Sequence, residues 1–267
     1  MSVALVTGAT AGIGAAFARR LARDGTDLVL LARDRDRLAS AADELRQAHG
    51  VKVETVVADL STEAGLSVAE QRAAEGIDLL VNNAGFGHQG WFLDAPLDVE
   101  LTTMRVHCEA VLRLTYAALP HMLRHGTGGV INVASIAAFV ARGTYGASKA
   151  WVVSFSESVA AEIVGSGVQV TAVCPGWVRT EFHRRADLDV NDVPRYLWLE
   201  PEAVVDAALR DFSRGVRVSI PTTRYKVIVG LNRAVPRRLA AAISARVGSR
   251  RTGRRAAAPT GREHGPG

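Results

Sequence analysis

The 267-residue chain, with 48% hydrophobic and 22% charged residues, has the length and composition of one large or two small globular domains. Its net charge of +5 is unevenly distributed along the chain. Residues 221–267 hold 11 Lys and Arg and one acidic residue, a balance of +10. Residues 1–220 hold the other 21 basic and 26 acidic residues, a balance of −5. No run approaches the roughly 20 apolar residues of a membrane span, and no secretory signal is recognisable. The two cysteines, Cys108 and Cys174, lie far apart in sequence, which favours a reducing compartment over a disulfide. We therefore expect a cytoplasmic protein.

The chain opens with a strand, a glycine-rich turn and a helix. An apolar run at Val3–Val6 is followed by Thr7-Gly8-Ala9-Thr10-Ala11-Gly12-Ile13-Gly14, by helical composition over Ala15–Arg23 and by a second apolar strand at Leu28–Leu31. Glycines at the first turn of a βαβ unit let the backbone approach a pyrophosphate, and the next helix aims its amide groups and dipole at that group. The spacing Gly-x-x-x-Gly-x-Gly, placed between a strand and a helix, therefore indicates a dinucleotide site.

Strands and helices keep alternating up to residue 220. We expect helices at about 35–49, 63–75, 97–123, 145–164 and 201–212, and strands at 52–57, 77–81, 130–133, 168–173 and 216–220. The strands are almost entirely apolar, which is typical of a parallel sheet covered by helices on both faces. The sequence predicts an α/β fold with a doubly wound parallel sheet, as one domain over residues 1–220 without an internal repeat or linker.

Tyr145 and Lys149 are four residues apart at the start of one predicted helix, so both side chains lie on one face, about one turn apart. An ammonium group so placed favours the phenolate, and we expect it to lower the pKa of Tyr145 below its usual value near ~10. Such a tyrosine can exchange a proton with a substrate oxygen, and the hydroxyl of Ser135, ten residues upstream, can hold that oxygen. The alternative is a surface helix whose lysine packs along a tyrosine ring.

Five motifs fall in the order found in the short-chain dehydrogenase/reductases. They are Thr7-Gly8-x-x-x-Gly12-x-Gly14, Asn82-Asn83-Ala84-Gly85, Ser135, Tyr145-x-x-x-Lys149 and Pro175-Gly176. Over about residues 1–220 the chain thus resembles this family, and the resemblance implies a Rossmann-type fold and an NAD(P)-dependent oxidoreductase. Taken alone, Asn82-Asn83 is a loop after a strand and Pro175-Gly176 is a plain turn.

By position, the resemblance assigns cofactor contacts to a set of residues. The cofactor turn would be formed by Gly8, Thr10, Ala11, Gly12, Ile13 and Gly14; the adenine would meet Asp59 and Leu60; Asn83 would line the nicotinamide side, and Val178 and Thr180 would hold the carboxamide. The resemblance also places Tyr145 and Lys149 at the cofactor, with Lys149 on the nicotinamide ribose. No metal ion is implied.

The end of the second strand bears on the choice between NAD and NADP. NAD-binding folds usually place a carboxylate there for the ribose 2′-OH, whereas this chain has Ala32 followed by Arg33. An arginine suits a 2′-phosphate through paired charge-assisted hydrogen bonds, so we expect NADP (NADPH) as the cofactor. The alternative is a solvated arginine among Arg35 and Arg37, with Asp34 close enough to disfavour a phosphate.

The chain departs from the family pattern at two points. Members commonly carry an asparagine of a water-mediated proton relay in the long helix before the catalytic serine, and alignment places His107 there. Histidine both donates and accepts hydrogen bonds, so we expect the relay to persist in altered form; the alternative is a histidine that only packs. The segment between Ser135 and Tyr145 is a few residues shorter than in many members, which would reshape one wall of the substrate site.

The segment Glu181–Glu200 lies where the family keeps its substrate loop, and it is rich in apolar residues. An apolar wall favours a small lipophilic carbonyl substrate; the alternative is a loop that simply buries its own apolar residues. Three segments look most like those of reductases of 3-oxo fatty-acyl chains: the short Ser135–Tyr145 segment, Thr180-Glu-Phe-His183 and Val235-Pro-Arg-Arg238.

Beyond residue 220 the composition changes. Residues 221–247 have the pattern of two basic amphipathic helices broken at Pro236, and residues 248–267, rich in Arg, Gly, Pro and Ala, have that of a disordered tail. A basic amphipathic stretch can lie on an anionic membrane. The alternative is a pair of helices packed on the body, followed by a solubilising tail.

The leading hypothesis is an NADPH-dependent carbonyl reductase, reversible as an alcohol dehydrogenase and expected to be a homo-oligomer. Tyr145 would act as general acid and base, Lys149 would lower its pKa, and Ser135 would orient the carbonyl. The rival is a non-catalytic NADPH-binding regulator with the same fold, against which the intact Ser–Tyr–Lys set argues. We expect no nucleic-acid partner, because the basic tail lacks interleaved aromatic residues and a reading helix.

Overall fold

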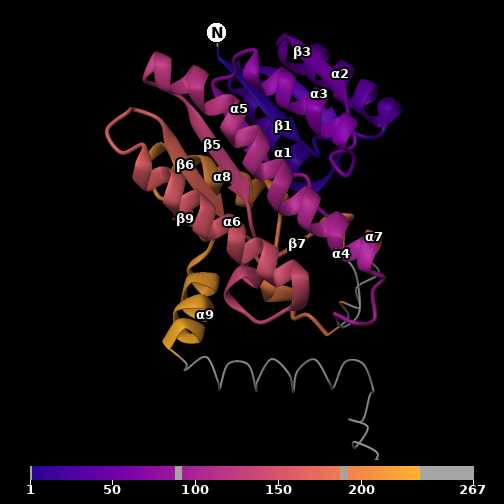
Figure 1. The fold of residues 1–267 in the computed structure, drawn as a ribbon, viewed down its shortest axis with the longest axis vertical. Helices are drawn as coiled ribbons and strands as arrows, with labels where there is room; N and C mark the ends of the chain where they lie inside the picture. The colour runs from indigo at the N-terminus through magenta and orange to yellow at the C-terminus, as the bar shows by residue number, and fades with distance from the viewer. Residues whose placement is uncertain (1, 88–91, 187–189, 191, 235–267) are drawn as a thin grey trace, which may run out of the picture.

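The computed structural model describes residues 2–87, 92–186, 190 and 192–234. Within them, seven parallel strands form one sheet in the order β3-β2-β1-β4-β5-β6-β9 (Figure 1). The strands are β1 (Val3–Thr7), β2 (Asp27–Ala32), β3 (Val53–Val57), β4 (Leu79–Asn82), β5 (Gly129–Val133), β6 (Gln169–Val173) and β9 (Val218–Ser219). The strand order reverses between β1 and β4, and the crevice outside the carboxyl ends of strands at such a point is where ligands bind in open α/β sheets. The predicted doubly wound sheet is confirmed.

Helices cover both faces of the sheet (Figure 1). One face packs against α1 (Gly12–Arg23), α2 (Arg35–His49) and α8 (Pro201–Ser213); the other packs against α3 (Glu63–Ala74), α5 (Ala110–His125) and α6 (Gly143–Glu162). Phe17 lies at the centre of the first layer, and Leu66 and Leu114 lie in the second, all fully buried. Because both faces are covered, the central strands are apolar at nearly every position.

The helix predicted over residues 97–123 is divided in two. The first part, α4 (Leu97–Met104), leads into one π-helical turn, η1 (Arg105–Glu109), before α5 continues. Such single π-turns inside α-helices occur often at functional sites, because the extra residue re-aims the side chains. Two other boundaries also differ: α1 begins at Gly12, inside the glycine turn, and the last strand is only two residues long.

Short elements fill the segment after β6. They are β7 (Trp177–Val178), α7 (Phe182–Arg185), η3 (Arg195–Leu197) and β8 (Trp198–Leu199), and a 3₁₀ turn, η2 (Ile136–Phe139), follows Ser135. The strands β7 and β8 pair in parallel as a separate small sheet. None of these elements was predicted, because strands of two residues and helices of three or four are too short to show a periodic pattern in the sequence.

The helix α9 (Thr223–Ala234) is the last element that the structure describes. The predicted break at Pro236, the second helix of the extension and the tail over 248–267 lie outside the described residues, as do Val235–Arg238. Among the helices described, none has the length and apolarity needed to cross a membrane.

Candidate active site

The N-terminus of α1 is open to a ligand. Its N-cap residue, Ala11, makes no side-chain cap hydrogen bond, and the first turn holds no acidic residue. Gly12 has a φ of +54°, and a Cβ added there would lie 2.9 Å from Cγ2 of Thr180; a Cβ added at Gly14 would lie 2.3 Å from the carbonyl oxygen of Gly8. Only glycine fits both places, and the helix dipole and uncapped amides favour an anion, so this turn fits the pyrophosphate of a dinucleotide.

Residues predicted for the nicotinamide side gather at the same turn. Asn83, after β4, donates from Nδ2 to the carbonyl oxygens of Thr7 at 2.9 Å and Gly8 at 3.3 Å, so its amide holds the glycine turn in shape. Thr180 follows β7 and packs against Gly12. Val178 is 3% exposed and belongs to the core.

Two further predicted turn residues are fixed by their surroundings. Ile13 packs partly buried against the first core layer. The carbonyl oxygen of Thr10 accepts a hydrogen bond at 3.1 Å from Nη2 of Arg37. The turn is therefore anchored by side chains from α2 and from the loop after β4.

The end of β2 presents an exposed cation. Arg33 is 72% exposed, with Nη1 at 3.8 Å from Oδ2 of Asp59. Asp34 is the N-cap of α2 and accepts from the backbone N–H of Arg37 at 3.0 Å, so capping occupies the carboxylate that could have bound a ribose. The Leu60 side chain is buried in the core, which leaves its backbone for an adenine contact.

Arg37, which the sequence suggested only as a solvated neighbour of Arg33, lies beside the glycine turn of the candidate cofactor site. Besides contacting Thr10, its Nη1 lies 3.2 Å from Oε2 of Glu181, and both residues line an open cleft of about 630 Å³. The cleft is lined by the glycine turn and by residues of α7 and β8. Arg37 lies inside α2, and no sequence pattern shows that this helix points back at the turn.

Ser135, Tyr145 and Lys149 converge where β5 ends and α6 begins. The Oγ of Ser135 accepts from the backbone N–H of Ala137 at 3.1 Å, and this hydroxyl is close enough to the phenol of Tyr145 to act on its pKa. Lys149 is 6% exposed; its Nζ donates to the carbonyl oxygen of Val133 at 3.0 Å and lies 6.0 Å from the centroid of the Tyr145 ring. The three side chains predicted for catalysis are thus brought together.

Burial governs the ionisation of this group. It raises the pKa of Tyr145, against the opposing effects of the Ser135 hydrogen bond and the Arg142 charge. It also lowers the pKa of Lys149 from 10.5 to about 8. The expectation that Lys149 lowers the pKa of Tyr145 below its usual value is therefore wrong for this structure, because desolvation of the phenolate outweighs the nearby charges. A phenol that stays protonated at neutral pH is suited to donate its proton.

His107 projects inward from the π-turn and is 1% exposed. Its Nε2 accepts from the backbone N–H of Phe86 at 3.2 Å, and its Nδ1 lies 3.0 Å from Oγ of Ser148, which itself donates to the carbonyl oxygen of Tyr145. This network assigns the proton to Nδ1. The imidazole, edge-on to Tyr145 at 5.6 Å between ring centroids, connects the loop after β4 to the helix that carries Tyr145 and Lys149.

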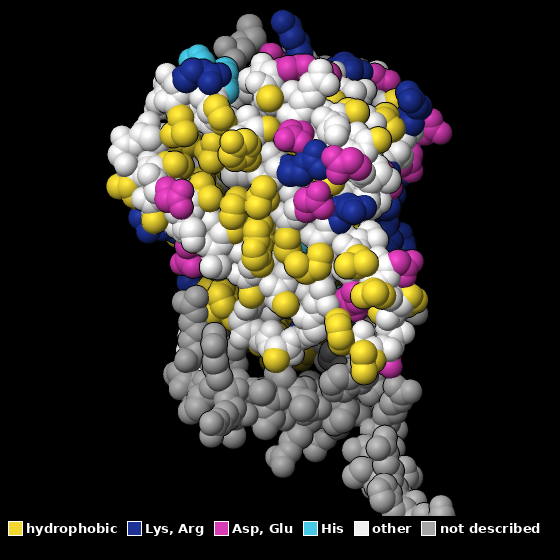
Figure 2. All heavy atoms as spheres, in the orientation of Figure 1, with side chains coloured by type: hydrophobic (Ala, Val, Ile, Leu, Met, Phe, Trp, Pro, Cys, Tyr) yellow, Lys and Arg dark blue, Asp and Glu magenta, His cyan; other side chains and the backbone are white. Residues whose placement is uncertain are grey.

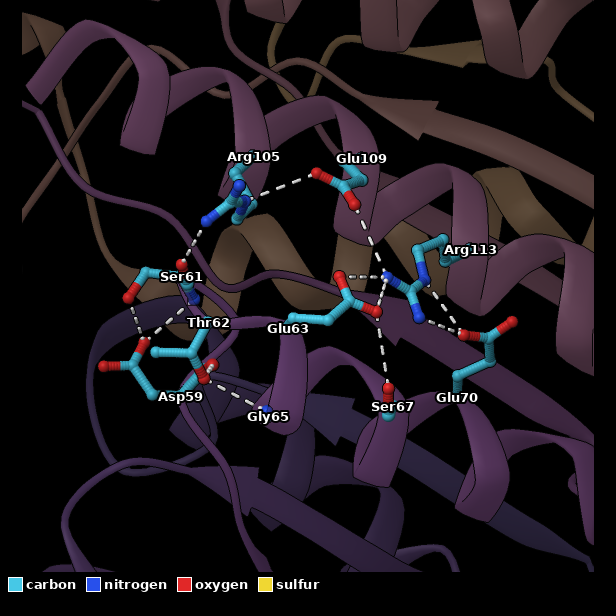
Figure 3. Close-up of polar contacts among 10 residues, drawn as sticks. All are labelled: Asp59, Ser61, Thr62, Glu63, Gly65, Ser67, Glu70, Arg105, Glu109 and Arg113. Atoms are coloured by element: carbon cyan, nitrogen blue, oxygen red, sulfur yellow. Dashed lines mark hydrogen bonds and ion pairs between the residues drawn. The ribbon is translucent and has the colours of Figure 1, made fainter. Parts of the chain in front are cut away.

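Polar side chains hold the outer side of the same π-turn (Figure 3). Arg105, its first residue, donates to the carbonyl oxygen of Ser61 at 3.1 Å and lies 3.5 Å from Glu109, its last residue. One turn further on, Arg113 pairs with Glu70 at 2.6 Å and with Glu63 at 2.8 Å. These contacts connect the turn to α3 and to the loop after β3, where the adenine contact is predicted.

Aromatic rings line the side of Tyr145 that faces the segment after β7. Phe182 lies 6.1 Å from the Tyr145 ring, and His183 packs between Trp177 at 5.0 Å and Trp198 at 5.1 Å. Burial lowers the pKa of His183, which favours its neutral form. This apolar wall lies where the substrate loop was predicted; residues 187–189 and 191 of that loop lie outside the described part of the chain.

Comparison with known proteins places these features in a family. A model of the short chain dehydrogenases matches residues 2–191. A short-chain dehydrogenase from Sphingobium yanoikuyae, solved in complex with NADPH, is 37% identical with a TM-score of 0.80 over 97% of this chain and 98% of its own. A bulky-bulky ketone specific alcohol dehydrogenase from Comamonas testosteroni is 32% identical with a TM-score of 0.76 over 97% of each chain. The very-long-chain 3-oxoacyl-CoA reductase of Anas platyrhynchos is 32% identical over 77% of this chain and 67% of its own.

Proposed function

The chain belongs to the short-chain dehydrogenase/reductase family of NAD(P)-dependent oxidoreductases, and we propose that it reduces a lipophilic ketone with NADPH. The observation that carries the proposal is the group at the end of β5: a half-buried phenol, a serine hydroxyl that acts on its pKa, and a buried lysine 6.0 Å from the ring. A protonated phenol, a hydroxyl that orients an oxygen and a neighbouring cation are what carbonyl reduction requires.

The roles of the three residues follow from their environments. The nicotinamide ring of bound NADPH supplies the hydride that reduces the carbonyl carbon. Tyr145 donates its proton to the carbonyl oxygen, and Ser135 orients that oxygen by hydrogen bonding. Lys149 carries a positive charge at neutral pH, because its pKa of about 8 is still above 7; the charge stabilises the phenolate left on Tyr145. Oxidation of the alcohol runs through the same groups in reverse.

The choice of NADPH over NADH rests on the charges around the adenine end. Arg33 is exposed just beyond β2, and Asp34 is engaged as a helix cap. Arg37 adds a second cation next to the glycine turn. The guanidinium groups of Arg33 and Arg37, which pair with Asp59 and Glu181 in this structure, favour a 2′-phosphate over a ribose hydroxyl.

A bulky or extended apolar ketone suits the aromatic wall formed by Phe182, Trp177 and Trp198. A 3-oxoacyl thioester is the specific candidate, supported by the similarity to the 3-oxoacyl-CoA reductase. Cys108 and Cys174 are buried and not joined in a disulfide, which suits a reducing cytoplasm, where we place the protein.

The deciding experiment follows NADPH consumption against ketones, aldehydes and 3-oxoacyl thioesters, for the wild type and Tyr145→Phe. Phenylalanine keeps the ring but removes the proton donor, so turnover of the best substrate should fall at least about a hundredfold while NADPH affinity stays unchanged. Tyr116→Phe, at an exposed tyrosine on α5, is the matched control and should be fully active. Substantial activity of Tyr145→Phe would overturn the assignment. A wild type that binds NADPH but turns over no compound of the panel would favour the regulatory alternative.

Homo-oligomerisation is supported by an apolar surface. Figure 2 shows hydrophobic side chains gathered on the face over α5 and α6. Leu112 is 44% exposed there, and Trp151 and Phe155 stack at 4.8 Å. A second copy of the chain would bury this face, and light scattering after gel filtration tests it. A monomer at micromolar concentration would refute the proposal.

Contact with an anionic membrane through the C-terminal extension is supported by α9. Val227, Ile228 and Leu231 are exposed on it, and residues 221–267 carry the +10 balance. The full-length protein should co-sediment with anionic vesicles at low salt and dissociate at high salt, because screening shortens the Debye length to about 8 Å near 0.15 M. No co-sedimentation at low salt would favour a solubilising tail.

A further inference from the structure

Tyr225 is the largest fully buried side chain of the described residues, although it lies on a helix with little other cover. It is 2% exposed, whereas Val227 and Ile228 on the same helix are 55% and 44% exposed. Its hydroxyl accepts a hydrogen bond from the backbone N–H of Trp177 at 3.0 Å and donates one to the carbonyl oxygen of Leu197 at 2.5 Å. The hydroxyl therefore acts both as an acceptor and as a donor, and its two partners lie 20 residues apart in sequence.

These two partners lie at the same end of the small β7–β8 sheet. Trp177 and Val178 pair with Trp198 and Leu199, and Leu197 directly precedes β8. A two-stranded sheet of two residues per strand has little stability of its own. The hydroxyl of Tyr225 bridges both strands where they begin, and this fixes their spacing from outside the loop.

The ring of Tyr225 also fixes the turn before β7. A Cβ added at Gly176 would lie only 1.9 Å from Cζ of Tyr225, so the phenol lies directly against this backbone. The neighbouring carbonyl oxygen of Pro175 accepts from the N–H of Ile136 at 3.0 Å, one residue after Ser135. The Pro175-Gly176 motif, which alone would be a plain turn, therefore connects α9 to the catalytic serine segment.

We propose that Tyr225 is a positioning residue for the nicotinamide half of the cofactor site: by holding β7 it sets Val178 and Thr180 in place against Gly12. Thr180 comes two residues after β7, and its Cγ2 would lie 2.9 Å from a Cβ added at Gly12, so a shift of this strand would move Thr180 off the glycine turn. The adenine half, built by β2, β3 and α2, has no contact with Tyr225 among those described. The proposal rests on the proposed dinucleotide-dependent function.

The test compares a whole cofactor with a fragment in Tyr225→Phe, which keeps the ring but leaves the N–H of Trp177 and the carbonyl of Leu197 without their bridge. Dissociation constants are measured calorimetrically for NADPH and for 2′,5′-ADP, which carries the adenine end alone. The constant for NADPH should rise about tenfold, while that for 2′,5′-ADP should stay within about twofold of the wild type. Tyr196→Phe, at a tyrosine 64% exposed and next to Leu197, is the matched control and should change neither constant.

The comparison separates positioning from simple loss of stability. Partial unfolding of a variant weakens both ligands by the same factor, so the ratio of the two constants reports only the nicotinamide half. Equal weakening of both ligands, or no weakening of NADPH, would overturn the proposal. Amide exchange gives an independent readout: the N–H of Trp177 should lose protection in Tyr225→Phe, and unchanged protection would contradict the bridge. If the wild type binds NADH and not NADPH, the proposed cofactor choice fails, and NADH with 5′-AMP then tests Tyr225.

Discussion

Lys149 should make the stability of this protein depend on pH with an unusual sign. Its side chain is 6% exposed, and burial lowers its pKa from 10.5 to about 8. The unfolded chain therefore binds this proton more tightly than the folded chain, so the free energy of unfolding should rise as the pH increases between about 8 and 10.5. With about 1.4 kcal/mol for each factor of ten, the full penalty below pH 8 is roughly 3 kcal/mol, and about 1 kcal/mol of it should be recovered between pH 7.5 and 9.

The assay is urea unfolding at several pH values from 7.5 to 9. The upper limit lies at the ordinary pKa of Cys108, 9.0, because burial raises the pKa of this thiol to about 11 and stability is lost as the pH rises between these two values. The chain has only three lysines, and Lys52, exposed before β3, provides the control. Lys149→Met should be more stable than the wild type at pH 7.5, by up to roughly 3 kcal/mol, and should lack the rise with pH. Lys52→Met should keep the rise. The reasoning is refuted if Lys149→Met shows the same rise as the wild type.

Three further predictions address the cofactor, His107 and the C-terminal helix. Arg33→Ala should raise the dissociation constant of NADPH about tenfold and leave that of NADH unchanged, because only NADPH carries the 2′-phosphate; equal losses in titrations of both would make Arg33 structural. His107→Asn should stay active in steady-state assays and His107→Leu should be slower, since leucine offers no hydrogen bond to the Phe86 loop; a fully active leucine variant would mean that the histidine only packs. In thermal melts, a chain cut after Ile220, which loses the buried phenol of Tyr225, should be about 3–5 kcal/mol less stable than one cut after Ala234, which keeps it; equal melting of the two would show that α9 adds no stability.

The sheet and the glycine turn were within reach of sequence reasoning because local patterns determine them. Apolar runs such as Leu28–Leu31 must be covered on both faces, so alternating strands and helices leave few arrangements other than a doubly wound sheet. Gly12 and Gly14 occupy positions where the structure has no room for a side chain. In both cases the type of residue, apolar or glycine, is enough to indicate the local structure.

The π-turn and the Tyr225 bridge were out of reach because their causes lie far away in the sequence. Residues 97–123 have ordinary helical composition, and the π-turn at Arg105–Glu109 has its partners in the loop after β3 and on α6. Nothing in α9 indicates that Tyr225 faces a loop 28 and 48 residues upstream. Only the folded chain brings these groups together.

The pKa values of Tyr145 and Lys149 were also beyond prediction from the sequence, because they depend on how much solvent the folded chain excludes. The four-residue spacing of Tyr145 and Lys149 correctly places the lysine beside the phenol, but spacing carries no information about solvent. In the folded protein both groups lose their hydration, and the neutral form of each becomes easier to adopt: the phenol holds its proton and the ammonium releases one more readily. Under the proposed function, a pair so arranged would keep its proton on the tyrosine until a substrate oxygen accepts it. This favours reduction at neutral pH, and the alcohol-oxidising direction should gain as the pH rises.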